Sequence, residues 1–172
     1  MKQTLWTALT LAGLAGLWAA VSSSASEAPV RVGRSLGPEV PALEARVSTH
    51  PADADALTRL ANAYLDGGAP GASQAALERA PARVRELPGV ADARARTLWQ
   101  LGFTHAALEA QRRMLDACSE RECSPVLVGR AQRRERLLSE LARHGVEDPR
   151  QDPRRTALAY RISMREAALD LR

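Results

Sequence analysis

The sequence predicts an all-α fold, and three observations support this prediction. After residue 41, apolar residues recur three and four positions apart, the spacing of one face of an α-helix. No segment alternates apolar and polar residues as a half-buried strand does, and aromatic residues make up only 3% of the chain. Glycine and proline divide the chain into segments of helical length. We therefore expect antiparallel helical hairpins stacked as a short solenoid, with a further helical hairpin at the C-terminus.

The first element is an export signal. Lys2 gives a basic start, and the segment 5–21 is apolar and uncharged. Small residues follow up to Ala25, as a signal peptidase requires. We therefore predict a signal peptide over residues 1–25, or alternatively an uncleaved anchor, although a membrane-spanning helix needs about 20 apolar residues. The protein is then periplasmic or secreted, and anchored to the inner membrane if the signal is retained.

A flexible linker is predicted over residues 26–41. This segment has no apolar period, and its glycines and prolines disfavour regular structure; they are Pro29, Gly33, Gly37, Pro38 and Pro41. After this segment the apolar residues take up helical spacing.

The clearest helix is predicted over residues 53–66. Its apolar residues form one stripe, Asp53 or Asp55 caps its start, and a pair of glycines ends it. A second helix begins near Ala72 and is interrupted by Pro81, because proline lacks the amide hydrogen and disfavours helical geometry in the preceding residue. Pro88 is expected to close this stretch.

Four more helices complete the fold. Two are predicted over residues 90–101 and 104–117, separated by Gly102. The residues 118–172 are expected to form a C-terminal helical hairpin. Its first helix has the start signal Ser124-Pro125 and ends at His144-Gly145, and its second starts at Asp152-Pro153 with Leu158, Ile162 and Leu169 as its buried stripe. Each helix has only one apolar face, so the helices must stack to be stable.

Cys118 and Cys123 are the only two cysteines, and they lie between the two halves of the folded part. In an oxidising compartment they are expected to form a disulfide that fixes the turn before the C-terminal hairpin. A redox-active pair is disfavoured because the Cys-x-x-Cys spacing is absent. His50, His105 and His144 follow no metal-ligand spacing, so we expect no metal site and no cofactor.

A repeat of 34 residues relates two parts of the chain. Gly68 and Gly102 both end a helix at this offset, which also aligns Ala61 with Ala95. The pattern Leu57-x-x-Leu60-Ala61-x-x-Tyr64 and the segment 102–110 resemble the tetratricopeptide repeat (TPR) family, whose unit is a 34-residue helical hairpin. The resemblance covers residues 42–117. Three residues depart from the family pattern: Pro81 breaks a second helix, and Arg94 and Gln111 stand where apolar residues are usual. Another helical-hairpin array would give the same spacing.

The resemblance implies a partner-binding groove lined by the first helix of each unit. The positions of this chain that match the groove are Thr58, Asn62, Asp66, Asp92, Arg96, Trp99 and Gln100. Asn62 is the most informative, because an asparagine there holds a bound peptide backbone with one donor and one acceptor. The alternative for the polar residues is a solvated helix surface, and for Trp99 a core position.

Charge and motifs restrict the function. The net charge is +4. The basic surplus lies in the last third of the chain, since residues 111–172 contain 14 arginines and 10 acidic residues. Catalytic motifs are not found, and Tyr64, Trp99, Phe103 and Tyr160, expected in the core or the groove, are too few for nucleic-acid stacking. We expect an exported, non-enzymatic interaction or scaffold module of the cell envelope that binds a protein or peptide. The alternative is a membrane-anchored structural protein whose Arg-rich C-terminal hairpin contacts anionic lipid or cell-wall polymer.

Overall fold

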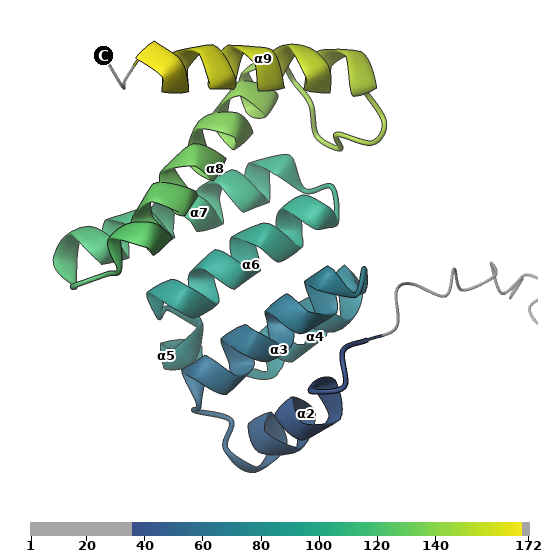
Figure 1. Ribbon diagram of the computed structural model, residues 1–172, viewed down its shortest axis with the longest axis vertical. Helices are drawn as coiled ribbons and strands as arrows, with labels where there is room; N and C mark the ends of the chain where they lie inside the picture. Colours follow the sequence, from purple (N-terminus) through teal and green to yellow (C-terminus); the bar gives the residue numbers. More distant parts are fainter. Residues whose placement is uncertain (1–35, 170–172) are drawn as a thin grey trace, which may run out of the picture. The chain divides into compact units, whose positions relative to one another are not determined.

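The structure is a computed structural model, and it describes residues 36–169, with side chains described as far as Arg165. This part of the chain folds into helices and contains no strand, so the all-α prediction is confirmed (Figure 1). The helices are α2 (Val40–Thr49), α3 (Ala54–Asp66), α4 (Pro70–Arg79), α5 (Ala82–Arg85), α6 (Pro88–Gln100), α7 (Thr104–Glu120), α8 (Pro125–Arg143) and α9 (Pro153–Leu169). None of these helices combines the length and the apolar character needed to cross a membrane. The predicted signal peptide and residues 26–35 of the predicted linker lie outside the described residues.

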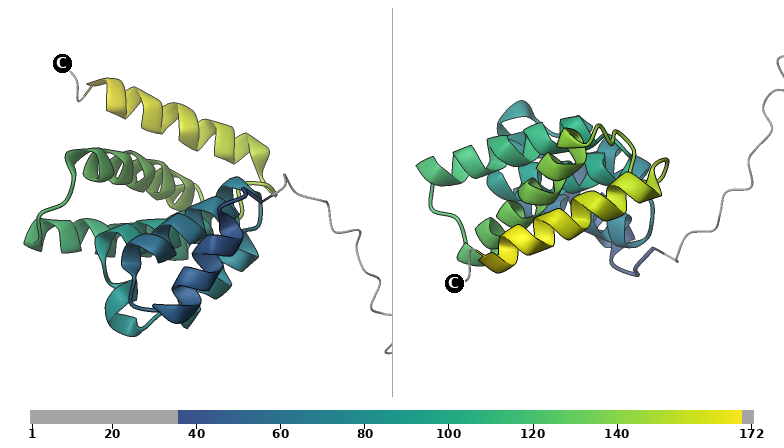
Figure 2. Two further views of the ribbon diagram at one scale, coloured as in Figure 1. Left: turned by 60° about the horizontal axis from the view of Figure 1, so that its bottom comes forward. Right: turned by 90° about the horizontal axis from the view of Figure 1, so that it is seen from above.

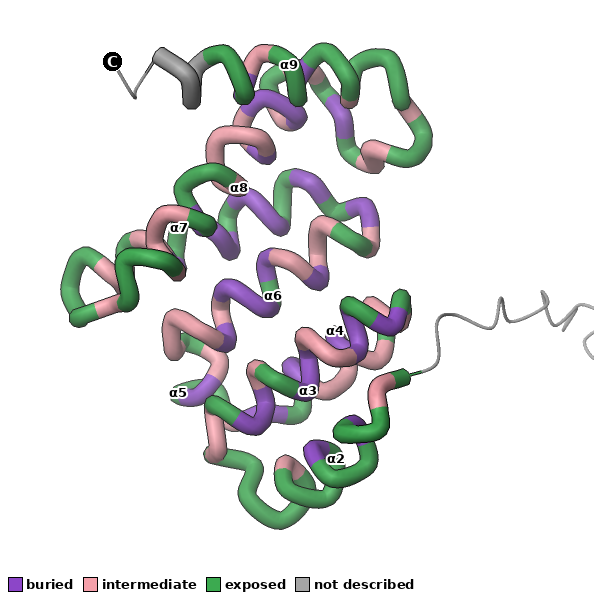
Figure 3. Tube along the Cα trace, viewed as in Figure 1, coloured by how far each residue is buried: buried purple, intermediate pink, exposed green. Residues whose placement is uncertain are grey.

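Consecutive helices pack side by side. The α3 helix contacts α2 and α4, and α6 packs on both α3 and α4. Further along the chain, α7 lies against α6, α8 against α7 and α9 against α8, an order that can be followed in Figures 1 and 2. Buried residues occupy the faces between neighbouring helices, and exposed residues the outer faces (Figure 3). Each helix therefore buries one apolar stripe against its neighbours, as its sequence period requires.

Proline marks the start of several helices. Pro70, Pro88, Pro125 and Pro153 are each the first residue of a helix, where the missing amide hydrogen costs nothing. Pro88 closes the preceding stretch, as predicted, and it also begins α6, two residues before the predicted start at residue 90. Asp53 caps α3 by accepting a hydrogen bond from the backbone N–H of Ala56 at 2.9 Å. This bond, together with the Arg46 side chain, lowers the pKa of the Asp53 carboxyl.

Pro81 interrupts a helix as predicted. The α4 helix ends at Arg79, Ala80 is extended with ψ of 147°, and only the short helix α5 follows before α6. At the N-terminal side, α2 begins at Val40, inside the predicted linker of residues 26–41, and Val40 is only 2% exposed. The folded part thus starts slightly earlier than expected, because Val40 and Leu43 bury against α3.

Two turns 34 residues apart have the same backbone geometry. Gly68 and Gly102 both have positive φ, 74° and 90°. The amide after each glycine donates to a carbonyl five residues earlier: Ala69 N to Tyr64 O at 2.8 Å, and Phe103 N to Leu98 O at 2.9 Å. Both turns are thus helix ends of the type that requires a left-handed residue, which glycine adopts without strain.

The two glycines differ in what surrounds them, and this difference predicts the effect of an added methyl group. A Cβ on Gly68 would meet nothing within 4 Å, whereas one on Gly102 would lie 2.6 Å from Asp148 Cγ. We expect Gly68→Ala to lower the free energy of unfolding by about 1 kcal/mol, the cost of a left-handed alanine. Gly102→Ala should cost about 2 kcal/mol, because the loop that carries Asp148 must also move. Urea denaturation followed by circular dichroism measures both values, and equal losses would contradict the packing of that loop.

The loop between α8 and α9 lies on the turn between α6 and α7. Arg150 Nη2 donates to the carbonyl of Leu101 at 2.9 Å, and the amide of Thr104 donates to the carbonyl of Glu147 at 3.1 Å. Arg150 also holds Asp148 with hydrogen bonds of 2.9 Å, which lower the pKa of the Asp148 carboxyl. The C-terminal hairpin is therefore joined to the preceding helices by its loop as well as by its helices.

The buried stripe of α9 differs from the prediction. Ala159 and Ser163 are buried, at 0% and 7% exposure, whereas Leu158 is 38% exposed and Ile162 is half-buried. The side chain of Leu169 lies outside the described part. Ala159, rather than the larger Leu158, belongs to the core cluster that contains Leu138 and Leu141 of α8. Close approach of two helices favours small residues at the contact, which explains this choice.

Cys118 and Cys123 are joined by a disulfide, with their Cα atoms 5.5 Å apart. Cys118 lies in the last turn of α7, which extends to Glu120, three residues beyond the predicted boundary at residue 117. Cys123 precedes the first residue of α8. The predicted covalent link between the two halves of the folded part is therefore present.

Candidate functional site

Three of the predicted groove residues form one polar cluster between α3 and α6. Arg96 Nη1 donates to Asn62 Oδ1 at 2.6 Å, and Arg96 Nη2 lies 3.6 Å from Asp66 Oδ1. Asn62 and Arg96 are the residues that the 34-residue offset aligns, so equivalent positions of the two helices touch. Asn62 Oδ1 is already used by Arg96, and its amide nitrogen is the group left to donate to a peptide carbonyl.

The remaining predicted groove residues lie in different environments. Thr58 is half-buried, and its hydroxyl donates to the Ala54 carbonyl of its own helix at 2.7 Å. Gln100 is exposed at the end of α6. Asp92 was expected to face the groove, but it is only 7% exposed, and its carboxylate accepts a hydrogen bond from Arg134 at 2.7 Å. Asp92 is thus engaged inside the protein, because side chains of α7 and α8 contact its carboxylate.

Asp92 belongs to a buried polar triad that links α6, α7 and α8. Arg134 Nη1 donates both to Asp92 Oδ1 and to Gln111 Oε1, the latter at 2.6 Å. Gln111 is 0% exposed and stands where the resemblance implies a large apolar residue. The triad explains this departure. The Gln111 side chain accepts a hydrogen bond from Arg134, and an apolar residue at this position could not do so.

Trp99 connects the polar cluster to a hollow at the C-terminal hairpin. Trp99 is half-buried against the core cluster around Leu138, and it lines a hollow of about 280 Å³. The side chains that line this aromatic hollow come from α6, α8 and α9; they are Trp99, Arg133, Arg134, Arg136, Leu137, Tyr160, Ser163 and Met164. Tyr160 and Met164 are 53% and 56% exposed, so their apolar surface is open to a partner.

The sequence prediction missed the α8 and α9 side of this site. Arg133, Leu137 and Met164 were not among the expected groove residues, and Tyr160 was expected in the core or the groove but is 53% exposed on α9. Tyr160 and Met164 are four residues apart, the spacing of one helix face, and this was the available signal. The stripe predicted for this helix was instead Leu158, Ile162 and Leu169. Phe103 was expected in the core or the groove, but it is 48% exposed at the turn between α6 and α7.

Tyr64, also expected in the core or the groove, is buried. Its hydroxyl donates to the Glu44 carboxylate, and it lines a hollow of about 590 Å³ between α2, α3 and α4. Burial raises the pKa of Tyr64 to about 12, and the hydrogen bond to Glu44 adds to this increase. Tyr64 therefore stays a neutral donor that holds α2 on α3.

No group of three or more His, Cys, Asp and Glu side chains that could hold a metal ion is found among the described residues. Both cysteines are in the disulfide. The site consists of hydrogen-bond donors, guanidinium groups and apolar side chains.

Comparison with known proteins gives no family assignment. No protein-family model, curated protein or solved structure matches this chain. Function therefore has to be inferred from the geometry of the site itself.

Proposed function

We propose that this chain is an exported, non-enzymatic interaction module with TPR-like repeats over residues 42–117, which binds a protein segment along the groove face. We define the groove face as Thr58, Asn62, Asp66, Arg96, Trp99 and Gln100 together with the aromatic hollow. Three features separated by 34 residues support the repeats. The turns at Gly68 and Gly102 share their hydrogen bonds, Ala61 and Ala95 are both 0% exposed, and Asn62 contacts Arg96.

The observation that carries the proposal is the continuity of the groove face along α6. Arg96 and Trp99 are three residues apart on this helix, so they lie on the same side of it. Arg96 joins the polar cluster on α3, while Trp99 joins the aromatic hollow on α8 and α9. A polar end for a peptide backbone and an apolar end for a large side chain together form a surface that an extended or helical segment can follow.

The chemistry of the groove face defines the preferred partner segment. The aromatic hollow provides an apolar pocket between Trp99, Leu137, Tyr160 and Met164, which suits a large apolar anchor residue. Arg133 is exposed beside this pocket, and a guanidinium there favours a carboxylate on the partner. We therefore expect a segment with an acidic residue close to an aromatic or long aliphatic one.

Two observations of different kinds support the proposed compartment. The basic and apolar N-terminal sequence predicts export, and the disulfide between Cys118 and Cys123 is a type of bond that persists in oxidising compartments. We propose a periplasmic or secreted protein whose partners belong to the cell envelope, with attachment to the inner membrane if the signal is retained.

A peptide-library selection on the purified protein tests the groove face. Enriched peptides should combine an apolar anchor with an acidic residue. The double variant Tyr160→Glu and Met164→Glu should weaken their binding at least about tenfold, because it places charge in the apolar pocket and opposes the acidic residue. Asn62→Ala combined with Arg96→Ala should weaken binding about tenfold by removing the polar end. Fluorescence anisotropy with a labelled selected peptide measures both effects.

Arg83→Ala is the matched control for this experiment. Arg83 is exposed on the short helix α5, outside the groove face, and its replacement removes one positive charge, as Arg96→Ala does. The control should bind as the unchanged protein does. Peptides that bind all variants equally would refute the groove face as the binding site.

The second candidate function is contact with an anionic membrane or polymer. Its support is α9, which exposes Leu158, Tyr160 and Met164 beside Arg161 and Arg165, a combination typical of helices that lie on membranes. Pelleting with vesicles of anionic lipid at low and high salt separates the two functions. Lipid attraction at low salt that disappears at high salt would favour the second candidate.

A further inference from the structure

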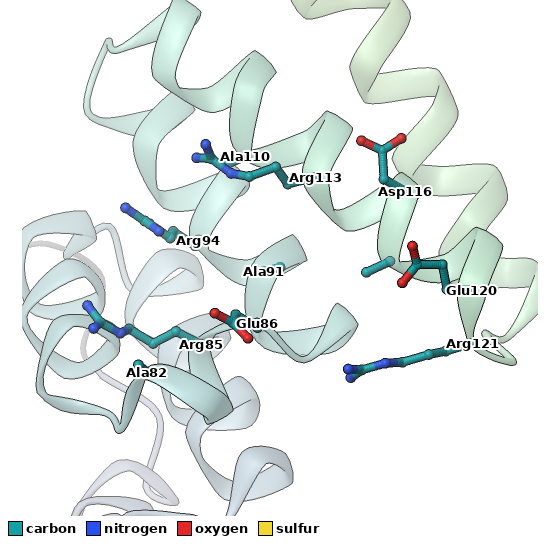
Figure 4. A pocket seen from close by; sticks show the side chains of 11 residues that line it. Ala82, Arg85, Glu86, Ala91, Arg94, Ala110, Arg113, Asp116, Glu120 and Arg121 are labelled. Atoms are coloured by element: carbon teal, nitrogen blue, oxygen red, sulfur yellow. The ribbon is translucent and has the colours of Figure 1, made fainter.

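A hollow of about 590 Å³ lies between α5, α6 and α7, apart from the groove face. Several alanines line this hollow, among them Ala91 from α6 and Ala110 from α7 (Figure 4). Arg94 of α6 lines this hollow, whereas Arg96 belongs to the groove face. Residues two apart in a helix point about 200° from each other, so α6 carries the two sites on nearly opposite sides.

Arginine side chains from three segments line the hollow. In Figure 4 the guanidinium groups of Arg85, Arg94 and Arg113 lie on one side of it, and Arg121 lies near its lower edge. Within the described part of the chain, Arg85, Arg94 and Arg121 form no ion pair. Arg113 has only a long contact of 3.8 Å with Glu109, and both side chains are exposed. These guanidinium groups are therefore available to a ligand.

Carboxylates also line the hollow, and they restrict the size of the ligand. Asp116 and Glu120 lie opposite the three arginines, and Glu86 lies between the two sides (Figure 4). A long polyanion that followed the surface would meet this acidic side and be repelled. A compact anion can contact the three arginines without reaching it.

We propose that this hollow binds a compact anion with two or more carboxylate or phosphate groups, held by Arg85, Arg94 and Arg113. The planar guanidinium group presents paired N–H donors that match the two oxygens of a carboxylate or phosphate. The three arginines come from α5, α6 and α7, so the packing of these helices sets the distance between them. The volume lies within the range of small-molecule sites, about 300 to 1,000 Å³.

Calorimetric titration of the full chain with pyrophosphate and with citrate tests the site. At least one of the two anions should bind, and Arg94→Gln combined with Arg113→Gln should weaken its binding at least about tenfold, because two charge-assisted contacts are lost. Glu86→Gln combined with Glu120→Gln should strengthen binding, since it removes carboxylates that repel the anion.

The control removes the same charge elsewhere. Arg130→Gln combined with Arg154→Gln changes two exposed arginines outside the hollow, on α8 and α9, and should leave the affinity within about twofold. Circular dichroism of each variant checks that the fold is retained. Equal weakening in the control would overturn the site in favour of general charge attraction. Binding of heparin without binding of pyrophosphate or citrate would overturn the compact ligand, and so would no binding of either anion at millimolar concentration.

Discussion

Replacement of Arg134 by methionine should lower the free energy of unfolding by about 4 kcal/mol, the range for breaking a buried ion pair by removing one partner. The side chains of Arg134 and Asp92 are 13% and 11% exposed, and Gln111 is 0% exposed. Without the guanidinium group, the Asp92 carboxylate stays in the interior with only a weak contact of 3.5 Å from Gln111. The cost is therefore mainly that of a buried, unpaired charge.

A triple variant separates this cost from the loss of packing. Arg134→Met together with Asp92→Leu and Gln111→Leu removes the whole triad and leaves apolar side chains of similar size. Such replacements are often neutral or stabilising, so the triple variant should recover most of the lost stability. Urea denaturation monitored by circular dichroism gives the values for both variants. If Arg134→Met costs less than about 1 kcal/mol, water reaches Asp92 and the triad is not a buried network.

The triad depends on contacts between distant residues, which the sequence alone does not predict. Asp92 and Arg134 are 42 residues apart, and nothing in their local pattern relates them. The family resemblance implied a groove position for Asp92. It is buried because Gln111 of α7 and Arg134 of α8 contact it, which is a property of the tertiary arrangement. Gln111 looked like a departure from an apolar position for the same reason.

Local features of the fold were predictable because local physics determines them. The break at Pro81, the cap at Asp53 and the end of α6 near Gly102 all follow from single residues with strong backbone preferences. The start of α6 was placed two residues late, at residue 90 instead of Pro88, since a proline that follows one helix and a proline that begins the next have the same local sequence.

The candidate site was half predictable. The family resemblance implied that Asn62 and Arg96 both face the groove, and the two side chains are in contact at 2.6 Å. Met164 was missed, and the exposed position of Tyr160 was not foreseen, because the orientation of α9 depends on which of its faces packs on α8. The face that carries the small side chains of Ala159 and Ser163 is the buried one.

A second large loss of stability is expected from changes in the two main core clusters, which share the helix α6. One cluster contains Leu57 with residues of α3 to α6, and the other contains Leu138 with residues of α7 to α9. The α6 helix contributes Val90 and Ala93 to the first cluster, and Leu98 and Trp99 pack on the second. The clusters are therefore connected through the body of one helix.

Leu57→Ala and Leu138→Ala should each lower the free energy of unfolding by about 3 kcal/mol, the usual cost of a cavity at a fully buried leucine. Both leucines are 0% exposed, so little relaxation can fill the cavity. Because α6 belongs to both clusters, each variant should still unfold in a single transition when followed by circular dichroism and by Trp99 fluorescence. Hydrogen exchange of the α3 amides in Leu138→Ala supplies the sharper measurement. Their protection should fall together with that of α8, because loss of the second cluster releases one side of α6. If the protection of the α3 amides stays at its original level, the two clusters unfold independently. In that case α6 does not couple the stability of one cluster to that of the other.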